Sequence, residues 1–254
     1  MSDLSAFDLT GRTVLVTGAN TGIGQGIAVA IARAGGHVLG AGRSSMTETA
    51  EQVSAVSGKL TPITVDLSDG QAALQMLDTV HREHGPIDGL VNNAGIIRRA
   101  DTTDHSETDW DEVLSVNLKT VFLLSQAFAK SAIAEDRPAK IVNIASLLSF
   151  QGGIRVAAYT ASKHGVAGLT KVMANEWAGR GINVNAIAPG YIESNNTEAL
   201  RADPDRSASI LSRIPAGRWG RPSDIGDATV FLLSQASNYM HGAIIPVDGG
   251  WLAR

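Results

Sequence analysis

The chain has 254 residues, of which 44% are hydrophobic and 18% charged, with no cysteine and a formal net charge of −4. The lack of cysteine excludes disulfides, thiolate metal sites and thiol catalysis. An acidic balance without a Lys/Arg block disfavours nucleic acid as a partner. The acidic first residues lack the apolar run of a signal peptide, and no stretch reaches the roughly 18–20 apolar residues of a membrane span. We therefore expect no membrane attachment and a cytoplasmic location.

Apolar, β-branched runs alternate with helix-like segments along the chain. The runs predicted as strands are Thr13–Thr17, Val38–Ala41, Leu60–Asp66, Gly89–Asn92, Lys140–Ile144, Asn183–Ala188 and Ala243–Val247. The predicted helices are Ile23–Ala34, Gln71–Glu83, Asp109–Ala134, Ala157–Gly179 and Pro222–Ser234. Strands that are apolar throughout suit a parallel sheet covered on both faces, and the alternation predicts βαβ crossovers. The expected fold class is α/β: a Rossmann-type doubly wound parallel sheet with helices on both faces, in a single domain over residues 1–254.

A glycine-rich turn follows the first predicted strand, in the segment Thr17-Gly18-Ala19-Asn20-Thr21-Gly22-Ile23-Gly24. Glycines permit a tight turn and let a pyrophosphate approach backbone N–H groups, and the dipole of the following helix favours an anion. A glycine motif alone also marks ordinary turns. Its place between a strand and a helix is the context that favours dinucleotide binding.

The residues after the second predicted strand bear on the choice of nicotinamide cofactor. An NAD enzyme usually has an acidic residue here for the ribose hydroxyls, whereas this chain has Gly42 followed by Arg43 and two serines. Arg43 can pair with a 2′-phosphate, which favours NADP. Against this, Asn20 and Thr21 give the glycine turn no basic residue, and Arg43 can also be a surface arginine or stack on adenine. The residues leave NAD and NADP open, with a slight preference for NADP.

Four residues have the chemistry of a carbonyl reductase. Tyr159 and Lys163 are four apart on a predicted helix and so share one face. Ser146 ends the fifth predicted strand, and Asn117 lies within the long predicted helix. Each alone has an ordinary explanation, because i, i+4 pairs are common on surfaces and serines commonly cap strand ends. No His/Asp/Glu cluster has metal-ligand spacing, so no metal site is predicted.

In combination these motifs resemble the short-chain dehydrogenase/reductase family over nearly the whole chain. The resemblance rests on the three glycines, Asp66 after the third strand, Asn92-Asn93-Ala94-Gly95 after the fourth, the Asn117/Ser146/Tyr159/Lys163 set and Pro189-Gly190 after the sixth. It implies an NAD(P)-dependent oxidoreductase, in which Asp66 contacts adenine and Asn92 with Gly95 forms a wall of the cleft. The cofactor-binding residues it implies are Gly18, Asn20, Thr21, Gly22, Ile23, Gly24, Arg43, Asp66, Leu67, Asn93, Ala94, Gly95, Tyr159, Lys163, Pro189, Gly190 and Ile192. The family is usually tetrameric, so a homotetramer is expected.

The resemblance assigns roles to the catalytic set. Ser146 would hydrogen-bond the carbonyl oxygen, Tyr159 would transfer the proton, and Asn117 would position a water. Lys163 would hold a ribose hydroxyl and lower the pKa of the Tyr159 phenol. A phenol has a reference pKa of about 10, and lowering this pKa by about two to three units requires roughly 3–4 kcal/mol of phenolate stabilisation.

Further segments resemble family members that act on keto-deoxy sugar acids: Ile96–Arg99, Ser149–Arg155, Ile187–Tyr191, Asn195–Thr197, Ile214–Gly220 and Val247–Arg254. Those members are generally described with NAD(H). A carboxylate substrate needs local cations, and arginine offers bidentate geometry; Arg98 and Arg99 follow the Asn-Ala-Gly turn, and Arg155 lies between Ser146 and Tyr159. The predicted substrate-binding residues are Arg98, Ser146, Gln151, Arg155, Tyr159 and Asn196. Residues 190–221 form a long polar segment after the sixth strand, predicted as a substrate lid, with a solvated helical excursion as the alternative.

Two other functions stay open. One is a reductase of the same family that acts on a 3-oxoacyl thioester or on a neutral polyol or ketose. The other is a non-catalytic protein that senses dinucleotides, although the complete Ser146/Tyr159/Lys163 set disfavours it.

Overall fold

A parallel β-sheet forms the centre of the molecule. The computed structural model describes residues 4–254, without the side chain of Asn196. The strands are β1 Thr13–Thr17, β2 His37–Gly42, β3 Lys59–Thr64, β4 Gly89–Asn92, β5 Ala139–Ile144, β6 Ile182–Pro189 and β7 Ile244–Val247. They lie in the order β3-β2-β1-β4-β5-β6-β7, and every neighbouring pair is parallel. The predicted fold class is confirmed, and each predicted strand is present with its ends within two residues.

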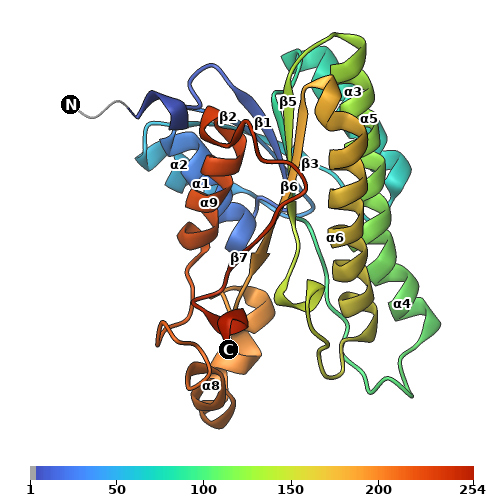
Figure 1. The fold of residues 1–254 in the computed structure, drawn as a ribbon, viewed down its shortest axis with the longest axis vertical. Coiled ribbons are helices and arrows are strands. Elements are labelled where there is room, and N and C mark those ends of the chain that lie inside the picture. The colour runs from blue at the N-terminus through green and yellow to red at the C-terminus, as the bar shows by residue number, and fades with distance from the viewer. Residues whose placement is uncertain (1–3) are drawn as a thin grey trace.

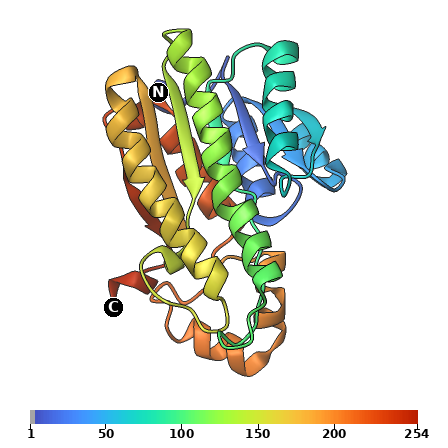
Figure 2. The ribbon, with the colours of Figure 1, turned by 90° about the vertical axis from the view of Figure 1, so that its right-hand side faces the viewer.

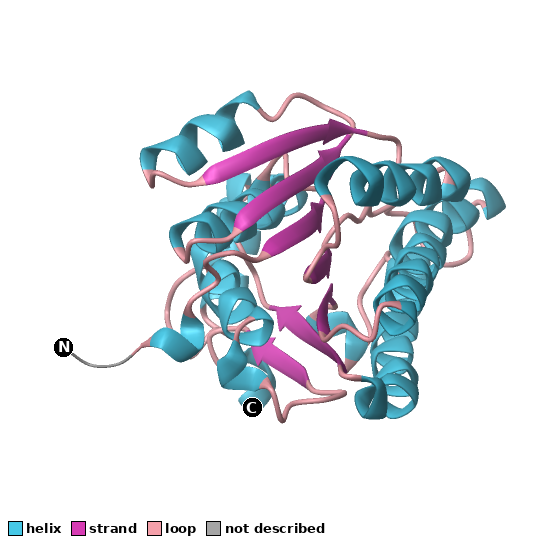
Figure 3. Cartoon of the chain, turned by 90° about the horizontal axis from the view of Figure 1, so that it is seen from above, coloured by secondary structure: helices cyan, strands magenta, loops and turns pink. Residues whose placement is uncertain are grey.

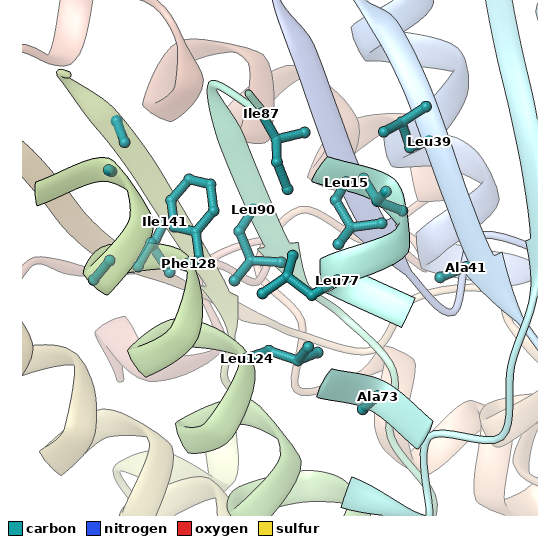
Figure 4. Packing of buried hydrophobic residues seen from close by; sticks show 14 of the residues in the cluster. Leu15, Leu39, Ala41, Ala73, Leu77, Ile87, Leu90, Leu124, Phe128 and Ile141 are labelled. Atoms are coloured by element: carbon teal, nitrogen blue, oxygen red, sulfur yellow. The ribbon is translucent and has the colours of Figure 1, made fainter. Parts of the chain in front are cut away.

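Helices cover both faces of the sheet, as the view along it shows (Figure 3). One layer contains α1 Gly22–Arg33, α2 Thr47–Ala55 and α9 Pro222–Leu233; the other contains α3 Gly70–His84, α4 Glu107–Leu114, α5 Thr120–Ala134 and α6 Ala157–Trp177. Side chains of a strand alternate between its faces. Leu15 of β1 therefore packs with Leu90 and Phe128 under α3 and α5 (Figure 4), while its neighbour Val16 packs with Ile27 of α1.

The long predicted helix Asp109–Ala134 is wrong as one continuous helix. The first helix of this region, α4, begins at Glu107, and the Ser106 hydroxyl caps it by accepting a hydrogen bond from the Asp109 N–H. A π turn over Ser115–Lys119 then separates α4 from α5. Such turns insert a residue into the helix and commonly mark functional sites. Local helix propensity does not reveal this turn, because the Asn117 side chain at its centre bonds to a distant loop, as described below.

The sequence patterns miss α2. They give no bounds for α7 Glu198–Ala202 and α8 Pro204–Leu211, which lie in residues 190–221, where a helical excursion was the alternative to a lid. Asp203 caps α8 by accepting hydrogen bonds from two backbone N–H groups, with Pro204 at the first helical position. These short helices and the C-terminal turn Trp251–Ala253 lie beyond one end of the sheet (Figures 1 and 2). They pack there through a separate cluster that contains Leu147, Ile210 and Trp251.

The topology determines where a ligand can bind. The chain runs outward from β1 to β3 and then returns to β4 on the other side of β1. Open α/β sheets bind ligands at the carboxyl ends of the strands where the order reverses. That point lies between β1 and β4. Among the described residues, no helix is long and apolar enough to span a membrane.

Candidate active site

A cleft of about 460 Å³ opens at the carboxyl ends of β1, β4, β5 and β6. Every residue predicted to bind the cofactor lines it: Gly18, Asn20, Thr21, Gly22, Ile23, Gly24, Arg43, Asp66, Leu67, Asn93, Ala94, Gly95, Tyr159, Lys163, Pro189, Gly190 and Ile192. Ser146 lines the same cleft, whereas Asn92, predicted as part of the cleft wall with Gly95, is 3% exposed and lies outside the lining. Residues spread over 175 positions of sequence are thus gathered because parallel strands end at one edge of the sheet.

The glycine turn has the backbone shape that a dinucleotide cradle requires. Gly18 and Gly22 have φ of 67° and 54°, which side-chain-bearing residues rarely adopt. A Cβ on Gly24 would lie 1.9 Å from the Gly18 carbonyl oxygen, so only glycine lets α1 begin so close to β1. Asn93 fixes the turn by donating from Nδ2 to the Thr17 and Gly18 carbonyls at 2.9 and 3.2 Å. These residues fit a dinucleotide.

Charged and polar groups stand at the adenine end of the cleft. Arg43 is 67% exposed, and its guanidinium lies 4.0 Å from Asp66. Hydrogen bonds from the backbone N–H and hydroxyl of Ser68 hold the pKa of Asp66 below its usual range, and Arg43 adds to this. Asn20 donates to the Ser44 hydroxyl at 2.6 Å. With Gly42 at the end of β2, this end of the cleft presents the Arg43 guanidinium, the Asp66 carboxylate and the Ser44 hydroxyl.

Ser146, Tyr159 and Lys163 converge at the opposite end of the cleft. The Ser146 hydroxyl accepts a hydrogen bond from the Leu148 N–H at 3.1 Å, which leaves its proton to be donated. Ser146 is hydrogen-bonded to Tyr159. The Lys163 ammonium donates to the Ile144 carbonyl at 2.6 Å and lies 5.5 Å from the centre of the Tyr159 ring.

Burial dominates the titration of both groups on α6. It raises the pKa of Tyr159 above its ordinary value, although the Ser146 hydrogen bond and the charge of Arg99 act in the opposite direction. Burial lowers the pKa of Lys163 to about 8. The expectation that the phenol has a lowered pKa is therefore wrong for this structure, because desolvation of the phenolate outweighs the stabilising groups.

Asn117 lies behind the cleft wall and is fully buried. Its Oδ1 accepts from the Ile96 N–H at 2.8 Å, while its Nδ2 donates to the Ile96 carbonyl at 2.9 Å and to the Ser162 hydroxyl at 3.3 Å. The amide thus holds the loop after β4 against the helix of Tyr159. This task differs from the predicted positioning of a water.

The structure does not bring the predicted arginines to the cleft. Arg98 forms a two-pronged ion pair with Glu112 at 3.0 and 2.9 Å, and Arg155 pairs with Asp101 at 3.0 Å. Carboxylates of the chain therefore already neutralise both guanidinium groups. Gln151 follows the turn after Ser146 outside the cleft lining, and the side chain of Asn196 lies outside the described part.

The sequence patterns missed Glu112, Ser194 and Thr197, which line the cleft together with Asn195. Arg99, a candidate cation from the sequence along with Arg98, acts electrostatically on Tyr159. No periodic pattern separated Arg99 from Arg98, because residues 93–100 belong to no helix or strand. The lining residues 194–197 come from the predicted lid segment.

A family model, curated relatives and solved structures each match this chain over nearly its whole length. The family model described as Enoyl-(Acyl carrier protein) reductase matches residues 18–252. The chain is 57% identical to the 2-dehydro-3-deoxy-D-gluconate 5-dehydrogenase of Escherichia coli (strain K12), covering 99% of each. A structure from Agrobacterium tumefaciens with bound NADP, provisionally named a 2-deoxy-D-gluconate 3-dehydrogenase, is 60% identical with a TM-score of 0.94, covering 98% of this chain and 99% of that one. A gluconate 5-dehydrogenase from Burkholderia cenocepacia, in complex with NADP and tartrate, is 36% identical with a TM-score of 0.94 and full coverage of both chains.

Proposed function

Because the chain belongs to the short-chain dehydrogenase/reductase family of NAD(P)-dependent oxidoreductases, we propose that its substrate is a keto-deoxy sugar acid. The reaction interconverts 2-dehydro-3-deoxy-D-gluconate and 3-deoxy-D-glycero-2,5-hexodiulosonate. One observation carries the proposal: Ser146, Tyr159 and Lys163 meet in a dinucleotide-shaped cleft of a chain 57% identical to an enzyme named for this substrate.

The three side chains divide the work of carbonyl reduction. The glycine turn and Lys163 would hold the nicotinamide cofactor, which would supply the hydride. Ser146 donates a hydrogen bond to the substrate carbonyl oxygen, and Tyr159, protonated at neutral pH because its pKa is raised, gives its proton to the alkoxide that develops there. Lys163 provides a positive charge beside the phenol and a donor for a ribose hydroxyl. Asn117 keeps the loop that forms the cleft wall in place.

We propose NADP(H) as the preferred cofactor. A 2′-phosphate carries negative charge that a cation can bind and that an acidic residue would repel. Arg43 and Ser44 line the adenine end of the cleft, and Gly42 leaves it without the carboxylate of NAD enzymes. Two solved relatives carry NADP.

Arg99 is proposed as a cation near the substrate carboxylate, because its charge acts on the Tyr159 hydroxyl. The relative from B. cenocepacia holds tartrate, itself a hydroxy acid. A reaction that draws on the nicotinamide pool also favours the cytoplasm.

A hydride-transfer assay tests the proposal. Purified protein is given NADPH or NADH with the 2,5-diketo sugar acid, and separately with a 3-oxoacyl thioester and a neutral ketose. We expect the highest kcat/KM with NADPH and the sugar acid. Tyr159→Phe should bind NADPH as the wild type does but lose at least about a thousandfold in kcat, since general acid catalysis is worth about 10²–10⁴.

Three outcomes would contradict parts of this scheme. Faster turnover of the thioester or the ketose would identify that compound as the substrate class in place of the sugar acid. NADPH binding without turnover of any carbonyl compound would favour a sensing role. Full activity of Tyr159→Phe would overturn the mechanism.

A further inference from the structure

A row of buried polar side chains crosses the sheet behind the candidate active site. Asn92 of β4 and Asn143 of β5 lie side by side in register, and Ser125 of α5 and Thr170 of α6 flank them. Exposure is 3% for Asn92 and 0% for the other three. These residues occupy the layer beneath α5 and α6 that is otherwise apolar.

The four side chains form one directed chain of hydrogen bonds. Asn92 donates from Nδ2 to the Ser125 hydroxyl at 2.9 Å and to Asn143 Oδ1 at 2.8 Å. Asn143 then donates to the Thr170 hydroxyl at 3.0 Å, which donates in turn to the Val166 carbonyl at 2.8 Å. Asn92 therefore joins β4 to α5 and to β5, and Asn143 joins β5 to α6.

The elements joined in this way are those that carry the reacting groups. β4 leads into the cleft wall at Asn93, β5 leads to Ser146, and α6 carries Tyr159 and Lys163. Near the cleft, α6 is attached to β5 by the Lys163–Ile144 hydrogen bond. The Asn143–Thr170 bond is a second attachment, seven residues further along α6 on the same face of the helix.

We propose that the Asn143–Thr170 hydrogen bond positions α6 along β5 and thereby aligns Tyr159 with Ser146. Asn143 and Thr170 are positioning residues, since neither lines the cleft. The Lys163–Ile144 and Asn143–Thr170 bonds hold α6 to β5 at two points, in addition to the Asn117–Ser162 bond near the cleft, and so restrict rotation of the helix on the sheet. The inference rests on the proposed roles of Ser146 and Tyr159 but not on the identity of the substrate.

Stability alone gives a poor account of this row. Buried polar networks are no more stabilising than well-packed apolar side chains of the same volume, and unmatched members destabilise. Asn92 Oδ1 is buried and has no hydrogen-bond partner among the described residues. The Asn92 Oδ1 atom is thus left unpaired, while the hydrogen bonds of Asn92 and Asn143 are kept. These directional bonds set the distances between β4, β5 and α6 more narrowly than apolar contacts would.

Thr170→Val tests the proposal because it removes the hydroxyl and keeps the shape of the side chain. The chain offers a matched control in Thr229 of α9, also 0% exposed, whose hydroxyl donates to the Ile225 carbonyl at 2.8 Å on the other face of the sheet. Thr170→Val and Thr229→Val each remove one buried hydroxyl that donates to the backbone carbonyl four residues earlier in its helix. A merely structural role predicts a larger loss of stability in Thr170→Val, which also leaves the buried Asn143 amide without its acceptor, but no separate loss of kcat.

We expect both variants to fold, with the larger loss of Tm in Thr170→Val because the Asn143 amide loses its acceptor there. Thr170→Val should lower kcat by about tenfold, with the affinity for NADPH within about twofold of wild type, and Thr170→Ser should restore kcat. A tenfold loss corresponds to about 1.4 kcal/mol. Equal kcat values for Thr170→Val and Thr229→Val would overturn the proposal.

A second readout needs no turnover and so separates this proposal from the proposed function. The chain has three tyrosines, and the ultraviolet phenolate titration of a protein minus that of its Tyr159→Phe form isolates Tyr159. Since the Ser146 hydrogen bond lowers the pKa of Tyr159, loss of alignment in Thr170→Val should raise that pKa, whereas Thr229→Val should not. An unchanged Tyr159 titration in Thr170→Val would refute the positioning role even if no substrate were found.

Discussion

Lys163 is a member of the catalytic set whose pKa lies close to neutral pH. Burial lowers its pKa to about 8, whereas burial raises the pKa of Tyr159 above its ordinary value. The phenol therefore stays protonated through the neutral range, which suits a proton donor for reduction. The ammonium beside it exists below about pH 8 and is lost above it.

The rate of carbonyl reduction should consequently fall as the pH rises through about 8. Lys163 becomes neutral there and no longer supports the negative charge that Tyr159 acquires when it releases its proton. The measurement is kcat/KM for reduction across the neutral and alkaline range. Lys163→Arg keeps its charge over that range, so its residual activity should lack this limb; the same limb in that variant would assign the titration to another group.

At the scale of the element, the helix α6 carries Tyr159 and Lys163 and also contains two glycines. The helix spans Ala157–Trp177 and has no side-chain cap at its first turn, where Arg155 just before it has a φ of 63°. No capping side chain therefore fixes the start of α6, and the position of the helix depends on its contacts with other elements. Gly165 and Gly168 lie within it, and only the first is packed closely, against Leu118.

Gly168→Ala should raise the free energy of unfolding by up to about 1 kcal/mol, because alanine is the better helix former and a Cβ there meets no atom within 4 Å. Gly165→Ala should gain less or lose stability, since its Cβ would come within 2.8 Å of Leu118. Urea denaturation of both variants measures the difference. Destabilisation by Gly168→Ala would mean that a partner covers this surface of α6.

At the scale of the whole molecule, α4, α5 and α6 present an apolar surface. Phe122 is 39% exposed and Val172 is 45% exposed, and a groove lined by Leu114, Leu118 and Leu169 runs beside Phe122. Apolar patches of this kind mark contacts between chains. We propose that this surface takes part in a homotetramer, the assembly expected from the family resemblance.

Light scattering should then give a mass near four chains of 26.5 kDa. Phe122→Glu should produce smaller particles, because a charge would be buried at the contact. Lys130→Glu, an exposed change on the same helix, should leave the mass unchanged. A wild-type monomer, or a Phe122→Glu protein of unaltered mass, would argue against this interface.

The sequence by itself determined the sheet, its strands and the cofactor cleft. Hydrophobic runs and glycine turns are local signals, and parallel strands bring their ends together whatever the distance along the chain. The predicted cofactor residues and Ser146, Tyr159 and Lys163 consequently meet in one cleft.

Only the tertiary structure decided how individual side chains are used. Arg98 and Arg155 are bound by carboxylates, Asn117 holds the Ile96 backbone within a π turn, and burial raises the pKa of Tyr159. Each of these depends on which groups from distant segments come within hydrogen-bond distance and on how much water is excluded. A sequence pattern fixes which groups are available, whereas partner choice and desolvation arise only when the chain is packed.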